Sequence, residues 1–186
     1  MNTMQIKRFF ANIWETAEIV IIALVTVLII RTFIAQPFLV SGASMEPNFH
    51  NGNYLLVDEI TYRFREPIRG EVIVFKYPGE QREYFIKRII GLPGETLTLA
   101  ESQITITSPE GTTTTLNERY LSNATRTFGE KVVTLGPDEY FVMGDNRGNS
   151  FDSRSWGPLE GSLIVGTARL RLFPFSQAGA LSAPQY

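Results

Sequence analysis

Tyr84–Glu95 reads YFIKRIIGLPGE, and this stretch decides the fold because it sets two basic residues inside an otherwise apolar, strand-like run. The Gly-Leu-Pro-Gly turn signal that follows the run predicts a strand over Glu83–Ile90. Side chains alternate across a strand, so Lys87 shares one face with apolar neighbours while Arg88 points to the opposite face. The pattern leaves two alternatives for Lys87, a desolvated interior position or the solvated edge where most strand lysines lie.

Stretches of the same kind surround this one and predict a mainly β fold. After Pro37, short runs rich in Val, Ile, Tyr, Phe and Thr alternate with Gly, Pro, Asn and Asp. The other predicted strands are Phe38–Val40, Tyr54–Glu59, Glu71–Lys76, Thr96–Leu99, Gln103–Thr107, Glu139–Met143 and Ser162–Leu172. Residues 100–133 are polar and Thr-rich, which predicts a hairpin or loop insertion. We therefore expect one antiparallel β-sheet body over residues 36–186.

One apolar segment precedes the β-rich body. Ile19–Ile30 contains only Ile, Val, Leu, Ala and Thr, and a window over residues 16–35 reaches the roughly 20 residues that a membrane span needs. Lys7 and Arg8 give the N-terminal flank a weak positive charge, which predicts that residues 1–15 are cytoplasmic. The side chains expected near the two membrane interfaces are Trp14, Glu18, Arg31 and Phe33. Residues 16–35 are thus predicted to be a transmembrane anchor.

Two alternatives compete for the same segment. It could be a buried core helix, or the apolar part of a cleaved secretory signal with Ser41-Gly42-Ala43 as its small-residue cleavage region. Arg31 and a further stretch of chain separate the apolar run from that tripeptide, which is a long separation for a cleavage site. We favour an anchor that is retained.

The composition excludes several classes of function. The 186 residues carry a formal net charge of -2 and no cluster of Lys and Arg, so the electrostatic footprint of a nucleic-acid binder is missing. Cysteine is absent, which excludes disulfides, thiol catalysis and thiolate metal sites. A single histidine, His50, argues against a zinc hydrolase. A hydrolase built from this chain must take its proton acceptor from Lys, Asp, Glu or His50.

Ser41–Pro47 (SGASMEP) is the candidate nucleophile motif, because its small residues allow a close approach of substrate to the backbone. The same residues also suit an ordinary turn, and alone the motif does not decide between the two. A serine hydroxyl attacks a carbonyl only when a base takes its proton. Lysine has an ordinary pKa of about 10.4, which burial can lower by several units. Ser44 and Lys87 are therefore the candidate nucleophile and base.

Gly144–Arg154 (GDNRGNSFDSR) follows a predicted strand and is dense in Asp, Asn, Ser and Arg. Such side chains hold tight loops through hydrogen bonds to the backbone. The spacing required of an EF-hand calcium loop, with its central Gly and closing Glu, does not occur. A loop braced by pairs of Asp and Arg remains as the structural alternative to a catalytic role.

Taken together, these motifs resemble the conserved boxes of type I signal peptidases. Ser41–Pro47 resembles the nucleophile box that follows the anchor, and Tyr84–Glu95 resembles the lysine box. Arg69–Phe75 (RGEVIVF) is similar to a middle strand box, and Gly144–Arg154 to the closing box. Their order and spacing agree as well. The resemblance implies an antiparallel β-sheet catalytic body of signal-peptidase type with one N-terminal transmembrane helix.

The resemblance also implies roles for individual residues. Ser44 would attack the scissile carbonyl, Lys87 would accept and return the proton, and no cofactor or metal would be needed. The oxyanion would be received by the Ser44 N–H and by a second donor at Gly42. Ser150 would orient Lys87. The pairs expected to hold the shape of the site are Asp145 with Arg88 and Asp152 with Arg154.

This chain departs from the family pattern at three positions within these boxes. Gly42 stands where some members have a serine whose hydroxyl assists the oxyanion, so this chain must use a backbone donor, water or the displaced Ser41 instead. Asn48 stands where a threonine usually follows the proline, and Gly148 where an acidic residue is often found. We expect the last two to change only local turn chemistry.

By the same resemblance, the substrate is an exported preprotein that is bound as an extended strand and cut after a small residue in an Ala-X-Ala-like sequence. The residues expected to line its pockets are Phe38, Val40, Met45 and Ile86. The lipid bilayer and the protein export machinery are the other expected partners. The expected location is the plasma membrane, or another energy-transducing internal membrane, with the catalytic body on the extracytoplasmic side.

Two rival functions fit single motifs. One is a self-cleaving Ser-Lys protein of the phage-repressor type, although a DNA-binding domain is missing from this sequence. The other is a membrane-tethered, β-rich interaction module without chemistry. Cleavage of a signal-bearing precursor separates both from a signal peptidase.

Overall fold

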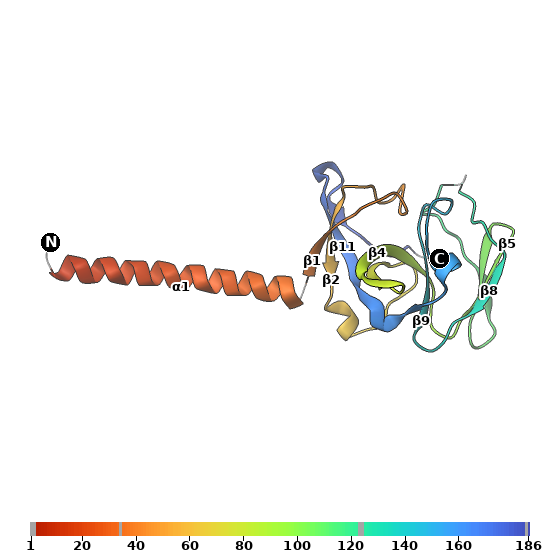
Figure 1. Ribbon diagram of the computed structural model, residues 1–186, viewed down its shortest axis with the longest axis horizontal. Helices are drawn as coiled ribbons and strands as arrows, with labels where there is room; N and C mark the ends of the chain where they lie inside the picture. The colour runs from red at the N-terminus through yellow and green to blue at the C-terminus, as the bar shows by residue number, and fades with distance from the viewer. Residues whose placement is uncertain (1–2, 34, 123–124, 185) are drawn as a thin grey trace.

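The structure is a computed structural model that describes residues 3–33, 35–122, 125–184 and 186 and, within the first helix, the side chains of residues 12–28. Helix α1 (Thr3–Phe33) is 31 residues long and extends away from a β-rich body, as Figure 1 shows. In the part of α1 with described side chains, residues 12–28 are all exposed.

Among the described residues, no helix combines the length and the apolar composition that crossing a membrane requires. The side chains of four predicted flanking residues, Lys7, Arg8, Arg31 and Phe33, lie outside the described part of the chain.

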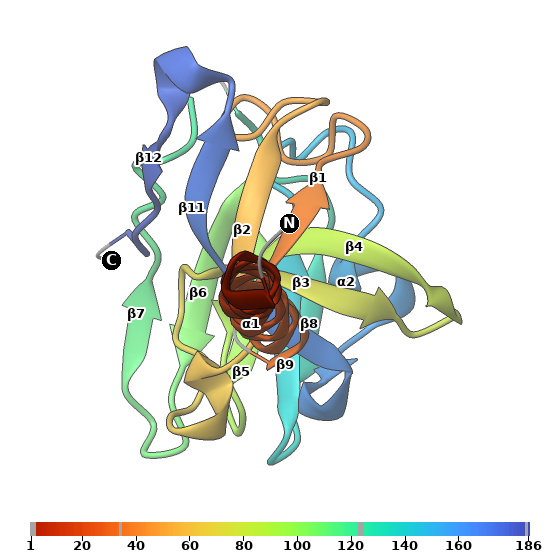
Figure 2. The ribbon, with the colours of Figure 1, turned by 90° about the vertical axis from the view of Figure 1, so that its left-hand side faces the viewer.

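The larger sheet has eight strands, and every pairing in it is antiparallel. Its order is β1-β2-β11-β3-β4-β9-β10, with β12 paired to β11. The strands are β1 (Ala35–Leu39), β2 (Tyr54–Asp58), β3 (Val72–Tyr77), β4 (Glu80–Gly91), β9 (Glu139–Met143), β10 (Leu159–Glu160), β11 (Ile164–Phe173) and β12 (Gly179–Ala180). Figure 2, viewed along α1, shows β1, β2 and β11 side by side. The predicted mainly β, antiparallel architecture is confirmed.

A second sheet of four antiparallel strands is built largely from the polar, Thr-rich segment. Its order is β7-β6-β5-β8. The strands are β5 (Thr96–Ala100), β6 (Gln103–Thr107), β7 (Thr113–Thr115) and β8 (Lys131–Thr134). Residues 100–133, predicted as a hairpin or loop insertion, therefore contribute β6, β7 and most of β8, while residues 123 and 124 lie outside the described residues.

The remaining helical elements are short. They are η1 (Thr61–Arg63), α2 (Ser153–Trp156), η2 (Gly161–Leu163) and η3 (Phe175–Gln177). Asp152 begins α2, because its side chain accepts the backbone N–H of Arg154 and so satisfies a donor that the helix leaves free.

The two sheets share a hydrophobic core, in which the small sheet packs against β4 and β9 of the large sheet. Apolar residues from the inner face of the small sheet pack with residues of β4 and β9: Leu97, Leu99, Ile104, Ile106, Ile90, Phe141 and Met143. On the other face of β4, Ile89 packs with Ile73, Phe75 and Val142. The β4 strand is thus buried on both faces near its C-terminal end, and any charged residue there is removed from water.

Candidate active site

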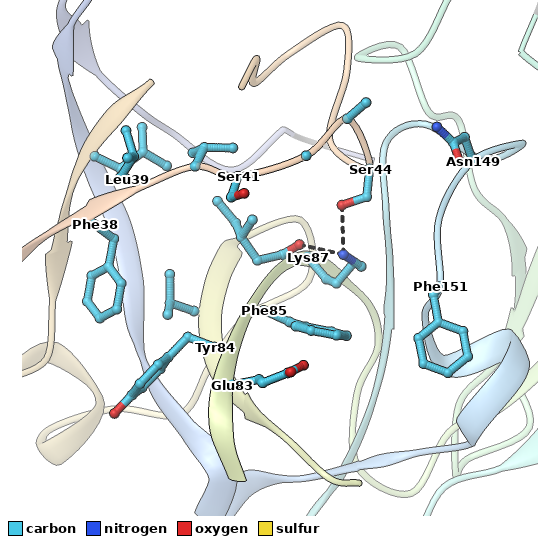
Figure 3. Close-up of a pocket in the computed structure, with 16 residues that line it drawn as sticks. Phe38, Leu39, Ser41, Ser44, Glu83, Tyr84, Phe85, Lys87, Asn149 and Phe151 are labelled. Carbon is cyan, nitrogen blue, oxygen red and sulfur yellow. Dashed lines mark hydrogen bonds between the residues drawn. The ribbon is translucent and has the colours of Figure 1, made fainter. Parts of the chain in front are cut away.

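Ser44 and Lys87 meet at the mouth of a pocket between β1 and β4. Lys87 Nζ lies 2.8 Å from Ser44 Oγ, in hydrogen-bonding contact, and 3.0 Å from the carbonyl oxygen of Ile86 (Figure 3). Ser44 lies in a turn that follows β1, and Lys87 lies within β4. The structure thus brings together the two residues that the sequence predicted as nucleophile and base.

The Lys87 side chain is buried, with 4% of the residue exposed. Burial lowers the pKa of Lys87 to about 8, against the opposing attraction of the Asp152 and Asp145 carboxylates. In the described part of the chain, Lys87 forms no ion pair. Its Nζ instead lies 5.3 Å from the centre of the Phe85 ring. A minor fraction of this amine is therefore neutral at pH 7, and this fraction grows as the pH approaches 8. A neutral amine can take a proton from a hydroxyl.

The turn that carries Ser44 is held by its own backbone. The Glu46 N–H donates to the Ala43 carbonyl at 3.2 Å, and the Phe49 N–H donates to the Met45 carbonyl at 2.9 Å. In the described part of the chain, the Ser44 N–H donates to no acceptor. It remains available to an oxygen bound in the pocket.

The second predicted oxyanion donor is already engaged. The Gly42 N–H donates to Asn51 Oδ1 at 3.0 Å, across the connection between β1 and β2. Gly42 has a φ of 91°, a conformation that glycine adopts without strain. In this conformation the Gly42 N–H does not serve as the predicted donor, because Asn51 occupies it.

Arg88 and Asp145 form a buried ion pair on the far side of β4. Arg88 Nε and Nη2 donate to the two carboxylate oxygens of Asp145 at 2.9 and 2.7 Å, and Arg88 Nη1 donates to the Gly70 carbonyl at 2.8 Å. Burial alone would lower the pKa of Arg88, but the hydrogen bonds and charge of Asp145 raise it above its ordinary value. Arg88 therefore stays charged at every working pH, whereas Lys87 loses its proton as the pH passes about 8.

Asp152 and Arg154 form the second predicted pair. Arg154 Nε and Nη2 donate to the Asp152 carboxylate at 2.8 and 2.9 Å, and the Gly144 N–H donates to the same carboxylate at 3.0 Å. Burial raises the pKa of Asp152, but the hydrogen bonds from Arg154 and Gly144 outweigh it and hold this pKa below its ordinary value. Asp152 thus remains an anion that joins the two ends of the closing loop, Gly144–Arg154.

Ser150 lies beside the dyad but does not contact Lys87 through a hydrogen bond in the described structure. Its hydroxyl is buried and has no hydrogen-bond partner among the described residues. A Cβ at Gly144 would overlap both Ser150 Oγ and the Ser44 carbonyl oxygen, so this glycine lets the closing loop approach the nucleophile turn. The orienting role of Ser150 remains a prediction.

The pocket beside the dyad has a volume of about 550 Å³. Of the residues predicted to line it, Phe38, Val40 and Ile86 do so. Met45 does not line this pocket and instead is buried in the core with Val40, Phe49 and Leu55, since the turn points it inward. Lining residues that the sequence did not single out as pocket residues include Glu83, Tyr84, Asn149 and Phe151.

The polar segment of the second sheet also reaches the site, which sequence reasoning missed. Asn48 Nδ2 donates to Asp145 Oδ2 at 2.8 Å and to the Tyr120 carbonyl at 3.0 Å. The Arg88 guanidinium lies 4.1 Å from the centre of the Tyr120 ring. The asparagine at position 48 therefore joins the nucleophile motif to the closing loop and to the insertion, which is more than the local turn change that we expected.

Arg147 anchors the closing loop to the same segment. It pairs with Glu118, donates to Thr127 Oγ1 at 2.7 Å and donates to the Gly144 carbonyl at 3.2 Å. Among the described residues, no group of three or more His, Asp or Glu side chains is arranged to bind a metal ion.

Comparison with known proteins agrees with this geometry. The family model described as signal peptidase, peptidase S26, matches residues 13–173. "Probable signal peptidase I-2" of Synechocystis sp. is 33% identical over 177 residues, covering 92% of this chain and 78% of the relative. "Signal peptidase I" of Bacillus amyloliquefaciens is 35% identical over 182 residues, covering 91% of this chain and 90% of the relative.

A crystal structure of a signal peptidase I from Enterococcus faecalis V583 covers 55% of this chain and 97% of its own, at 28% identity and a TM-score of 0.47. The family model spans most of the chain, and both named relatives exceed 30% identity over most of it. The resemblance to type I signal peptidases is thereby confirmed: the chain belongs to the signal peptidase family, peptidase S26, and is a type I signal peptidase, a serine endopeptidase.

Proposed function

We propose that this enzyme removes signal peptides from exported preproteins by a Ser-Lys dyad, with Ser44 as nucleophile and Lys87 as general base. Family membership supports the removal of signal peptides. The observation that carries the dyad is the 2.8 Å contact between the Ser44 hydroxyl and an amine whose pKa burial lowers to about 8. An amine in that state accepts a proton at working pH and returns it from the conjugate acid.

The reaction runs in two halves. Ser44 Oγ attacks the carbonyl carbon of the scissile bond while Lys87 Nζ takes the hydroxyl proton, and the Ser44 N–H stabilises the oxyanion. Collapse breaks the C–N bond, and Lys87 gives its proton to the departing amine of the mature protein. A water molecule then attacks the ester, Lys87 takes a proton from it, and the proton returns to Ser44 Oγ as the signal peptide leaves with a new carboxylate.

The residues around the dyad hold its geometry in this proposal. Asp145 with Arg88 fixes the closing loop against β4, and Asp152, through Arg154 and the Gly144 N–H, joins the two ends of that loop. Ser150 orients the Lys87 amine; the support is that its hydroxyl is buried next to the turn that carries Ser44. These residues position the reacting groups and do not react themselves.

We propose that the substrate binds as an extended strand between β1 and β4 and is cut after a small residue of an Ala-X-Ala type site. β1 is the last strand at its end of the large sheet, and residues 84–87 of β4 pair with β3 and, in the described part of the chain, with no second strand. Both edges can therefore form backbone hydrogen bonds with a peptide. Phe38, Val40 and Ile86 line the pocket, and their size favours small substrate side chains.

The decisive experiment compares Ser44→Ala, Lys87→Ala and the matched control Lys76→Ala in cleavage of a precursor whose signal peptide ends in Ala-X-Ala. Lys76 is exposed on the neighbouring strand β3. We expect Ser44→Ala and Lys87→Ala to lose cleavage by several orders of magnitude and Lys76→Ala to retain it. Full processing by either dyad variant, in a sample that unfolds at the wild-type temperature, contradicts the mechanism.

We also propose that α1 anchors the enzyme in the plasma membrane, or another energy-transducing internal membrane, with the body on the extracytoplasmic side. The support is a helix that projects from the body with its apolar side chains exposed, among them Ile19, Leu24 and Leu28 (Figure 1). Anchoring would hold enzyme and translocating preprotein at one surface and so raise their effective concentration. The protein export machinery would then be a neighbour.

Extraction of membranes with alkaline carbonate tests the anchor on the full chain. The wild-type enzyme should stay in the pellet, a variant with Leu24→Lys and Val27→Lys should be released, and the control Glu15→Lys at the flank should stay. Release of the wild-type chain into the soluble fraction would show that α1 is not an anchor. The dyad experiment is independent of this result.

A further inference from the structure

Asn146 contacts the backbone on both sides of the nucleophile. Its side-chain Nδ2 donates to the Ala43 carbonyl at 3.0 Å, and its own N–H donates to the Ser44 carbonyl at 3.0 Å. The two partners are separated from Asn146 by roughly a hundred residues of chain and belong to a different part of the fold. One residue of the closing loop therefore clamps both peptide units that flank Ser44.

The Ala43 carbonyl and the Ser44 N–H belong to the same planar peptide unit. In a trans peptide the C=O and the N–H point in opposite directions, so a group that fixes the oxygen also fixes the direction of the N–H. The Ala43 oxygen accepts two hydrogen bonds, from Asn146 Nδ2 and from the Glu46 N–H. Donors at a carbonyl also polarise the peptide and strengthen its N–H as a donor.

The Ser44 N–H matters more in this chain because the expected second donor is occupied. Asn51 accepts the Gly42 N–H, whereas the Ser44 N–H donates to no acceptor in the described part of the chain. Loss of one oxyanion donor typically costs about 10²–10³-fold in turnover. A Ser44 N–H that points away from the oxyanion should therefore lower turnover strongly in this site.

We propose that Asn146 is a positioning residue of the oxyanion hole: its side-chain amide fixes and polarises the Ala43–Ser44 peptide so that the Ser44 N–H meets the developing oxyanion. The inference rests on the proposed function of Ser44. Arg88 donates to Asp145, which precedes Asn146, and Arg147, which follows Asn146, donates to the Gly144 carbonyl. The amide is therefore carried on a loop that is itself braced.

Steady-state cleavage by Asn146→Ala, Asn146→Asp and the control Asn117→Ala tests this role in the full-length enzyme. Asn117 is exposed, and among the described residues only its backbone carbonyl takes part in a hydrogen bond, from the Arg119 N–H. We expect Asn146→Ala to lower kcat by about 10–100-fold, because a positioning group contributes less than the donor it directs. Asn146→Asp should lower kcat further, since a carboxylate cannot donate and repels the carbonyl oxygen. KM and the apparent pKa of the rate should stay at wild-type values, as should kcat of Asn117→Ala.

A peptide aldehyde adds a second readout, because the hemiacetal oxygen that forms on Ser44 occupies the oxyanion position. Asn146→Ala should weaken aldehyde inhibition by the same factor as kcat/KM, with a wild-type unfolding temperature. A wild-type kcat, or a loss that appears as a higher KM or a shifted pH profile, overturns the proposal. If Ser44→Ala and Lys87→Ala process precursor normally, the proposed function itself fails. If those variants are inactive while Asn146→Ala is normal, only the role of Asn146 fails.

Discussion

Two adjacent basic residues on opposite faces of β4 have pKa values that shift in opposite directions. Lys87 and Arg88 are almost equally buried, with 4% and 5% of each residue exposed. On one face Lys87 meets a hydroxyl, a carbonyl and the Phe85 ring, and burial lowers its pKa to about 8. On the other face Arg88 meets the Asp145 carboxylate in two hydrogen bonds and stays charged. Equal burial thus gives a base on one face and a structural cation on the other, because only one face supplies a carboxylate partner.

The largest change in stability should come from removing the Asp145 carboxylate. Asp145→Ala leaves the Arg88 guanidinium buried without its carboxylate, and breaking a buried ion pair in this way typically costs about 3–5 kcal/mol of unfolding free energy. Denaturant unfolding of the full chain in detergent measures the loss. The matched control is Glu160→Ala, since Glu160 is exposed on β10. The double variant Asp145→Ala with Arg88→Met should recover part of the loss, because no buried charge is then unpaired. A single variant as stable as Glu160→Ala would contradict this account of Arg88.

Removing the amine on the other face should instead raise the unfolding free energy, because buried Lys87 forms no ion pair among the described residues. Folding favours neutral Lys87, so between a pKa of about 8 in the folded state and the ordinary 10.5 the unfolded chain binds more protons. The stability of the wild type should rise with pH across that window and be lowest below it. Lys87→Met removes the charge and keeps the length, and it should raise the unfolding free energy at neutral pH by about 1–3 kcal/mol. It should also abolish cleavage. Equal stability of both proteins from pH 7 to 10 would show that Lys87 is not desolvated.

Much of this arrangement follows from local pattern, and some of it does not. The sequence alone predicts that Lys87 and Arg88 lie on opposite faces of the strand Glu83–Ile90. Successive side chains of any strand alternate between its two faces, so no knowledge of tertiary contacts is needed. β7 and β8 were not predicted as strands, since β7 is exposed along its whole length and no apolar alternation marks it. Met45 is expected in the pocket because its position matches a pocket-lining position of the family, but an apolar side chain in a turn fits a core equally well, and here it packs in the core.

The contacts of single asparagines were beyond sequence reasoning for a different reason. Asn146 donates to Ala43, which is 103 residues away in the sequence, and Asn48 donates to Asp145, which is 97 residues away. The Asn51 side chain accepts a hydrogen bond from the Gly42 N–H, which is only 9 residues away in the sequence. Asparagine suits loops wherever they lie, so its presence predicts a turn and not its partner. Such contacts depend on how two loops are brought together by the sheet.

The pH dependence of cleavage tests the Lys87 face during the reaction. Because the neutral amine is the active form, kcat/KM should rise about tenfold per pH unit below the pKa and level off above an apparent pKa of about 8. Initial rates on one precursor between pH 6 and 10 measure this profile, with unfolding followed at each pH as a control. The sign is fixed by the base role, since an acid catalyst would lose activity over the same range. A flat profile between pH 6 and 9 would exclude Lys87 as the base.

The smallest change in stability should come from the insertion, residues 100–133, whose Tyr120 ring packs against the Arg88 guanidinium. Tyr120→Leu removes the aromatic face that lies 4.1 Å from the guanidinium, and a cation–π contact of a desolvated arginine contributes about 0.5–2 kcal/mol. Tyr120→Phe is the matched control, because it keeps the ring and removes only the hydroxyl. The leucine variant should unfold more easily than the phenylalanine variant, while the apparent pKa of cleavage stays the same in both, since the change lies on the Arg88 face. A shift of that pKa in Tyr120→Leu alone would show that the two faces of β4 are coupled.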